Sequence, residues 1–188
     1  MRSIPVSSVL KHLGVAIAFA FCGYGSSVYL LSQFPDQMEF YFPLPFALLC
    51  ALLFLRTPRA VFVIPLMALD WLVASMVAFL VGASTNDPFL PGVAGGCIGA
   101  CGLILCVAIC DRRLLSPIYF VIGAIVGSLS AISFMPWAEL YIASVRLPGH
   151  VGLVKTPLIA FAIWQAAVGT CLYSFGTHAK KSLKNCRA

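Results

Sequence analysis

One carboxylate in this sequence lies where acid–base or cation chemistry is expected inside a membrane. Asp70 is the only charged residue well inside an apolar segment, and it falls near the middle of residues 60–82. A carboxylate at the bilayer midplane costs about 2.5–3.5 kcal/mol on insertion scales, and removal from water disfavours its charged form. Two roles are open. Asp70 either exchanges a proton or binds a cation, or it is a neutral carboxyl whose hydrogen bond to a neighbouring helix stabilises the bundle.

Gln165 is the expected partner of Asp70. The depth of each residue in the membrane can be counted from the cytoplasmic end of its segment, with a rise of about 1.5 Å per residue. The depths of Asp70 and Gln165 then agree within roughly 2 Å. Each adjoins a tryptophan in the sequence, Trp71 and Trp164. Tryptophan usually lies at the level of the lipid headgroups, so two at mid-depth indicate the wall of a cavity or a tightly packed centre. We therefore predict a substrate-binding or proton-binding site formed by these four residues.

Small residues crowd the segment 92–110 and recur in the next segment. Their spacing of four positions is the small-xxx-small pattern that lets helix backbones approach closely. The pattern predicts close packing within one chain or between subunits, and a glycine-lined permeation path is the other possibility. The residues assigned to helix packing are Gly92, Gly95, Gly96, Gly99, Gly123 and Gly127.

The sequence lacks the groups that an intramembrane enzyme needs. Such enzymes use an acid–base pair, a nucleophile with its base, or metal ligands, whereas the apolar segments hold one carboxylate and no histidine, lysine or arginine. Cysteine is frequent, but at 100° per residue Cys97 and Cys101 share one helix face, while Cys106 and Cys110 point nearly opposite. We therefore predict no catalytic residue, no metal site and no cofactor.

The elements that must position these residues are transmembrane helices. The chain has 188 residues, of which 61% are hydrophobic and 10% charged, and its mean hydropathy is +1.00. Soluble chains contain about 25% charged residues, so the excess apolar surface of this chain must contact lipid. The composition predicts an all-α, polytopic integral membrane protein that forms a single domain over residues 1–188.

A transmembrane helix needs about 20 predominantly apolar residues. Six segments fit this requirement, although the second is short: 13–31, 40–55, 60–82, 92–110, 114–134 and 156–176. We expect them to form a compact bundle with short loops. Residues 135–155 are too polar to span, and their aromatic residues at helical spacing predict an interfacial helix before the last span. Residues 177–188 form a basic tail.

The distribution of basic residues orients the bundle. With the N-terminus in the cytoplasm, only Arg146 and Lys155 of the twelve basic residues fall outside cytoplasmic segments, as the positive-inside rule requires. We therefore predict a plasma (inner) membrane protein with both termini cytoplasmic. The same scatter of basic groups between apolar segments argues against a nucleic-acid partner.

Two classes of function fit this architecture. The first is a protein that moves or admits a small solute or ion through a midplane site. The second is a non-transporting membrane subunit, whether a structural partner, a sensor or an oligomeric pore-forming effector. A transporter is expected to enclose a polar cavity within one chain, whereas a subunit is expected to pack its small-residue faces against another chain. The expected partners are the lipid bilayer and either further copies of the chain or other membrane subunits.

Overall fold

The computed structural model describes residues 6–33, 43–54, 60–85, 87, 89–109, 111–132 and 157–185. Every regular element within these ranges is helical, which confirms the all-α prediction. The α-helices are α1 (Val6–Gln33), α3 (Pro43–Phe54), α4 (Ala60–Ser84), α5 (Phe89–Ala108), α6 (Pro117–Ala131) and α8 (Pro157–Asn185), and η2 (Arg112–Leu115) is a short 3₁₀ helix. Each segment predicted to span the membrane overlaps one of these α-helices, and the segment at 114–134 also overlaps η2.

Within the part of the chain that the structure describes, four helices are long and apolar enough to cross a bilayer. The qualifying stretches lie in α1, α4, α5 and α8, and run over Ser7–Gly25, Val61–Ser84, Phe89–Ala108 and Ile159–His178. By contrast α3 has 12 residues and α6 has 15, fewer than the about 20 that a crossing needs. An all-helical chain with four apolar candidate spans among the described residues is therefore shown, and it is compatible with a membrane location; six crossings stay a prediction. The predicted interfacial helix, residues 135–155, lies outside the described residues.

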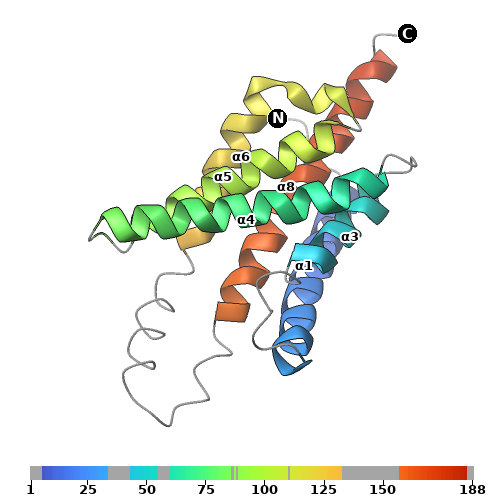
Figure 1. The fold of residues 1–188 in the computed structure, drawn as a ribbon. Coiled ribbons are helices and arrows are strands. Elements are labelled where there is room, and N and C mark those ends of the chain that lie inside the picture. The colour runs from blue at the N-terminus through green and yellow to red at the C-terminus, as the bar shows by residue number, and fades with distance from the viewer. Residues whose placement is uncertain are drawn as a thin grey trace.

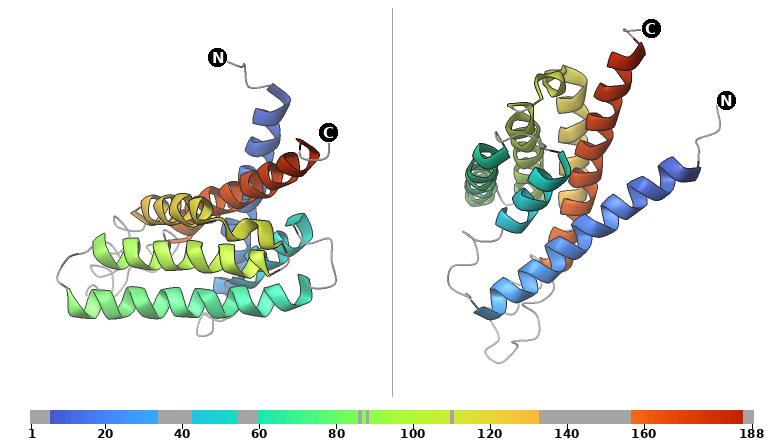
Figure 2. Two further views of the ribbon diagram at one scale, coloured as in Figure 1. Left: turned by 90° about the horizontal axis from the view of Figure 1, so that it is seen from above. Right: turned by 90° about the vertical axis from the view of Figure 1, so that its right-hand side faces the viewer.

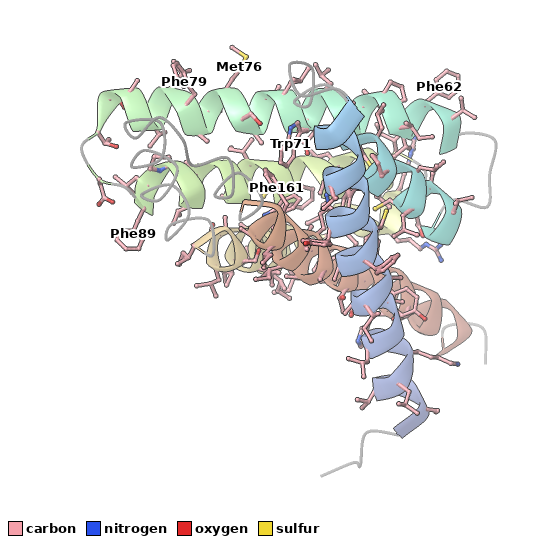
Figure 3. The ribbon with its side chains drawn as sticks, turned by 90° about the horizontal axis from the view of Figure 1, so that it is seen from below. Phe62, Trp71, Met76, Phe79, Phe89 and Phe161 are labelled. Atoms are coloured by element: carbon pink, nitrogen blue, oxygen red, sulfur yellow. The ribbon has the colours of Figure 1, made fainter. Side chains whose placement is uncertain are left out.

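Helices α4, α5 and α6 lie side by side, with α5 in the middle (Figures 1 and 2). Helix α8 packs against α6 and α1, and α3 lies between α1 and α4. Helix α1 crosses the direction of α4 and α5 steeply, as Figure 3 shows. The start of α1 and the end of α8 lie at the same end of the molecule, since the ring of His12 contacts that of Tyr173. This arrangement puts both termini of the described chain on one side.

Small residues form the seam between α4 and α5. A Cβ added at Gly95 would lie 2.9 Å from the Cβ of Ala78, and one at Gly99 would lie 3.4 Å from the Cβ of Ala74. From the first pair to the second, the position moves one turn forward on α5 and one turn back on α4, so the two helices run antiparallel. The backbones of α4 and α5 can therefore approach closely, as the small-xxx-small spacing predicts.

The opposite side of α5 uses small residues against α6. A Cβ added at Gly127 would overlap the carbonyl oxygen of Gly96 and lie 2.6 Å from the Cβ of Ala100. A Cβ at Gly123 would overlap the side chain of Ile104. Because adjacent residues differ by about 100° around a helix, Gly95 and Gly96 serve different neighbours. Gly95, Gly96 and Gly99 thus pack within the chain, on two sides of α5.

Candidate functional site

Asp70 lies near the middle of α4, and its side chain rests on the backbone of α5 at Gly102. A Cβ added at Gly102 would overlap the Asp70 carboxyl group, and its distance to Oδ2 would be 2.9 Å. Only glycine leaves room for the carboxyl at this place. No hydrogen bond or ion pair joins Asp70 to any residue that the structure describes. The interhelical hydrogen bond that a helix-locking role requires is therefore missing from this arrangement.

The Asp70 carboxyl lies at the outer rim of the α4–α5 seam. Ile98 and Leu105, one turn before and after Gly102 on α5, are 38% and 51% exposed, and Val73, one turn after Asp70 on α4, is 45% exposed. Asp70 itself is half-buried. The carboxyl is thus bordered on both helices by apolar side chains that point away from the chain.

Trp71 and Trp164 meet in an aromatic cluster on the inner side of α4. Their ring centroids are 6.2 Å apart in an edge-on arrangement, and Trp71 lies 5.1 Å from the ring of Phe161 (Figure 3). The ring of Phe46 on α3 lies 6.1 Å from that of Trp164. A Cβ added at Gly99 would lie 3.3 Å from the Trp164 ring. Of the two arrangements expected for these tryptophans, the described residues form the packed centre.

Gln165 faces α1 rather than α4. Its side chain lies over Gly23, where an added Cβ would overlap Oε1 and lie 3.0 Å from Cδ. Gln165 is 2% exposed, and its Oε1 forms no hydrogen bond with any described residue; the same holds for Nε1 of Trp164. The structure therefore brings the two tryptophans together but directs Asp70 toward α5 and Gln165 toward α1. The four residues do not form one polar site.

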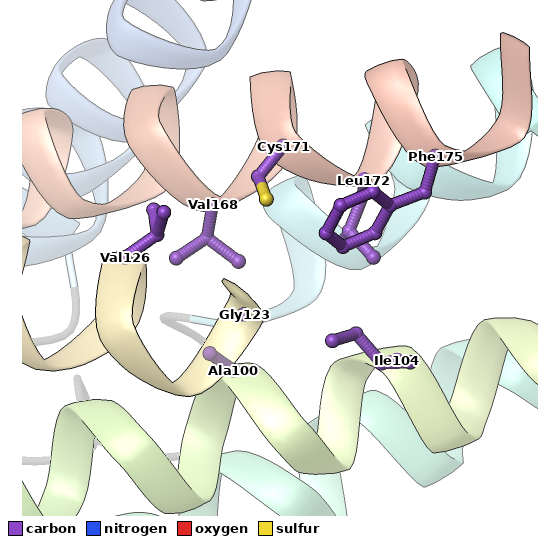
Figure 4. A pocket seen from close by; sticks show the side chains of 8 residues that line it. All are labelled: Ala100, Ile104, Gly123, Val126, Val168, Cys171, Leu172 and Phe175. Carbon is purple, nitrogen blue, oxygen red and sulfur yellow. The ribbon is translucent and has the colours of Figure 1, made fainter. Parts of the chain in front are cut away.

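An apolar crevice of about 170 Å³, counting the space open to its surroundings, lies between α5, α6 and α8 (Figure 4). It is lined by Ala100, Ile104, Gly123, Val126, Val168, Cys171, Leu172 and Phe175. No charged group and no oxygen-bearing side chain lines it, and neither Asp70 nor Gln165 reaches it. The crevice therefore offers no polar ligand to an ion or a polar solute.

None of the described cysteines forms a disulfide with another described residue: Cys22, Cys50, Cys97, Cys101, Cys106 and Cys171. Cys97 and Cys101 contact each other one turn apart on α5, on the shared face that their spacing predicts. The Cys22 thiol points to α3, where it donates a hydrogen bond of 3.5 Å to the carbonyl of Pro45. Within the described ranges, no three histidine, cysteine or acidic side chains gather in a metal-binding cluster.

The loop after α5 holds a compact ion pair. The side chain of Asp111 caps η2 by accepting the backbone N–H of Arg113, and the Arg113 guanidinium donates to the same carboxylate at 2.5–2.6 Å. This hydrogen bonding raises the pKa of Arg113 above its ordinary value. The neighbouring Arg112 is exposed. The positive charge predicted to face the cytoplasm here is thus partly offset by a carboxylate next to it.

Gly102 is the contact of Asp70 that the sequence-based prediction missed. Gly95, Gly99 and Gly102 are spaced by four and three residues, so they share one face of α5. This spacing is visible in the sequence, and it signals one partner helix for all three positions. Gly23 opposite Gln165 has no such signal, because nothing in the sequence indicates that α1 and α8 are neighbours.

Comparison of the chain with models of protein families, with curated proteins and with solved structures gives no match. Function is therefore inferred from the geometry of the described residues.

Proposed function

We propose that this chain is a small multi-pass membrane protein that moves a small ion across the bilayer, with Asp70 as the group that binds and releases it. The supporting observation is the state of the Asp70 carboxyl: mid-helix, half-buried over Gly102, and without a hydrogen bond or ion pair to any described residue. Ionisable groups inside a membrane are costly and mark ion pathways and proton relays. A carboxyl that takes no part in locking helices is available for exchange.

The proton is the ion that fits this carboxyl best. Hard divalent cations take about six or more oxygen ligands, whereas the near neighbours of Asp70 on α5 are Gly102 and the thiols of Cys101 and Cys106. One carboxyl group suffices to bind and release a proton. The proposed topology places both termini in the cytoplasm of a cell with a plasma (inner) membrane, in agreement with the shared end of α1 and α8.

The test is proton flux into liposomes that contain the purified chain and a trapped pH-sensitive dye. Asp70→Asn keeps the size of the side chain but cannot ionise, and we expect it to reduce the flux to that of empty liposomes while the melting profile stays unchanged. Asp87→Asn is the matched control, because Asp87 is exposed after α4 and caps the start of α5 at Phe89 N. Full flux through Asp70→Asn would contradict the proposal.

A second candidate is the non-transporting membrane subunit. The observation that favours it is the packed centre: the tryptophans close the middle of the chain, and the crevice of Figure 4 carries no polar lining. Absence of proton, sodium and potassium flux in a folded, reconstituted protein would favour this candidate over the first.

A further inference from the structure

We propose that the outer rim of the α4–α5 seam, centred on Asp70, docks a transmembrane helix of another protein that carries a basic side chain at mid-depth. We call this surface the Asp70 face; it consists of Leu69, Asp70, Val73, Ile98 and Leu105. The inference extends the proposed function and rests on it for the importance of Asp70.

The shape of the Asp70 face suits a helix. On α4, the exposed large side chains Phe62, Leu69, Val73 and Leu80 recur at intervals of seven, four and seven residues, which places them in one stripe along the helix. Figure 3 shows Phe62, at one end of this stripe, pointing away from the neighbouring helices. The stripe runs most of the length of α4 and passes beside Asp70, so a partner helix there has apolar contacts before and after the carboxyl.

The charge of the face determines the chemistry of the partner. Asp70 has no hydrogen bond or ion pair with any described residue, and the rim that it occupies is apolar. A polar group in this setting is costly until a partner supplies the missing interaction. A lysine or arginine at the same depth on a neighbouring helix provides the complementary charge.

A second copy of this chain does not provide that charge. Its predicted spans contain no lysine, arginine or histidine. In a two-fold dimer the same patch faces itself, so two Asp70 faces would bring one carboxyl against the other. Two ionised carboxylates repel each other, so the complement of the ionised Asp70 is a basic group on a different chain.

The experiment uses three synthetic transmembrane peptides as probes. Each is a leucine-rich helix of about 20 residues with one central position occupied by arginine, leucine or glutamate. Fluorescence energy transfer between labelled peptide and labelled full-length chain in liposomes measures association. We expect the arginine peptide to associate about tenfold more tightly than the leucine peptide, as for an interhelical polar contact in lipid, and the glutamate peptide to associate no better than leucine.

Variants of the chain locate the effect. Asp70→Asn is expected to remove the preference for the arginine peptide, whereas Asp87→Asn is expected to retain it. Equal association of all three peptides would overturn the inference, as would an arginine preference that survives Asp70→Asn. Energy transfer between two copies of the chain that is lost in Asp70→Asn would also overturn it, because the face then binds itself. Proton flux is measured in a separate assay. A chain that binds the arginine peptide but carries no proton flux supports the docking surface and contradicts the proposed function. A chain that carries flux but shows no arginine preference does the opposite.

Discussion

The contact between Asp70 and Gly102 predicts a non-additive effect on stability. A methyl group at Gly102 would overlap the Asp70 carboxyl, and overpacking of this kind costs about 1–3 kcal/mol. Replacing glycine by alanine inside a helix otherwise stabilises it by about 0.5–1 kcal/mol. We therefore expect Gly102→Ala to lower the free energy of unfolding by about 1 kcal/mol, the difference between these two effects.

Two comparisons isolate the cause. Gly14 on α1 has no atom within 4 Å of an added Cβ, so Gly14→Ala is expected to be neutral or slightly stabilising. In an Asp70→Ala background the carboxyl is absent, and Gly102→Ala is then expected to stabilise by about 0.5–1 kcal/mol. Denaturant-induced unfolding in detergent micelles, followed by far-UV circular dichroism, measures all four members of the cycle. A cost of Gly102→Ala that is the same with and without Asp70 would refute the placement of the carboxyl over Gly102.

Three further predictions test the topology and the packing. Cys186 in intact cells is expected to resist an impermeant thiol reagent until the membrane is opened, and labelling from outside would refute the cytoplasmic C-terminus. Gly127→Ala is expected to lower the free energy of unfolding by about 2–3 kcal/mol, because the added methyl group overlaps the α5 backbone. Gly82→Ala is expected to lower it by less, since the added Cβ would meet only the Pro91 side chain at 3.3 Å. Equal melting temperatures of the two variants would contradict this. Gln165→Leu removes a buried amide oxygen that has no hydrogen-bond partner among the described residues, and it is expected to raise the free energy of unfolding by about 1 kcal/mol. A lower free energy of unfolding would show that the amide has a partner.

The helical segments were predictable because hydropathy and length determine them locally. The segment expected at 60–82 is α4 over Ala60–Ser84, and the one expected at 92–110 is α5 over Phe89–Ala108. The small-residue spacing on α5 also anticipated close helix contacts. Both signals depend on residues within one segment, so a single sequence contains them.

The site was less predictable, because depth along a helix says nothing of direction around it. Asp70 and Gln165 have similar predicted depths, but Asp70 points to α5 and Gln165 to α1. The neighbours of each helix follow from contacts between distant parts of the chain, such as Gly23 with Gln165, and hydropathy does not encode them. The adjacency of Trp71 and Trp164 was suggested by depth, and here the directions agree.

The pattern of the α4–α5 seam indicates that Asp70 is more than a packing residue. Along α4 the side chains that meet α5 are Ala78, Ala74 and Asp70, at intervals of one turn, and their counterparts on α5 include Gly95, Gly99 and Gly102. For packing alone, a small apolar residue would be enough at position 70, because alanine there would fit against α5 without placing a carboxyl group in the contact. A carboxyl set against glycine departs from an otherwise consistent stripe, and such departures are expected at functional sites. The glycine beneath it then has a specific consequence: any larger residue at position 102 displaces the carboxyl and is expected to reduce proton flux even where the bundle remains folded.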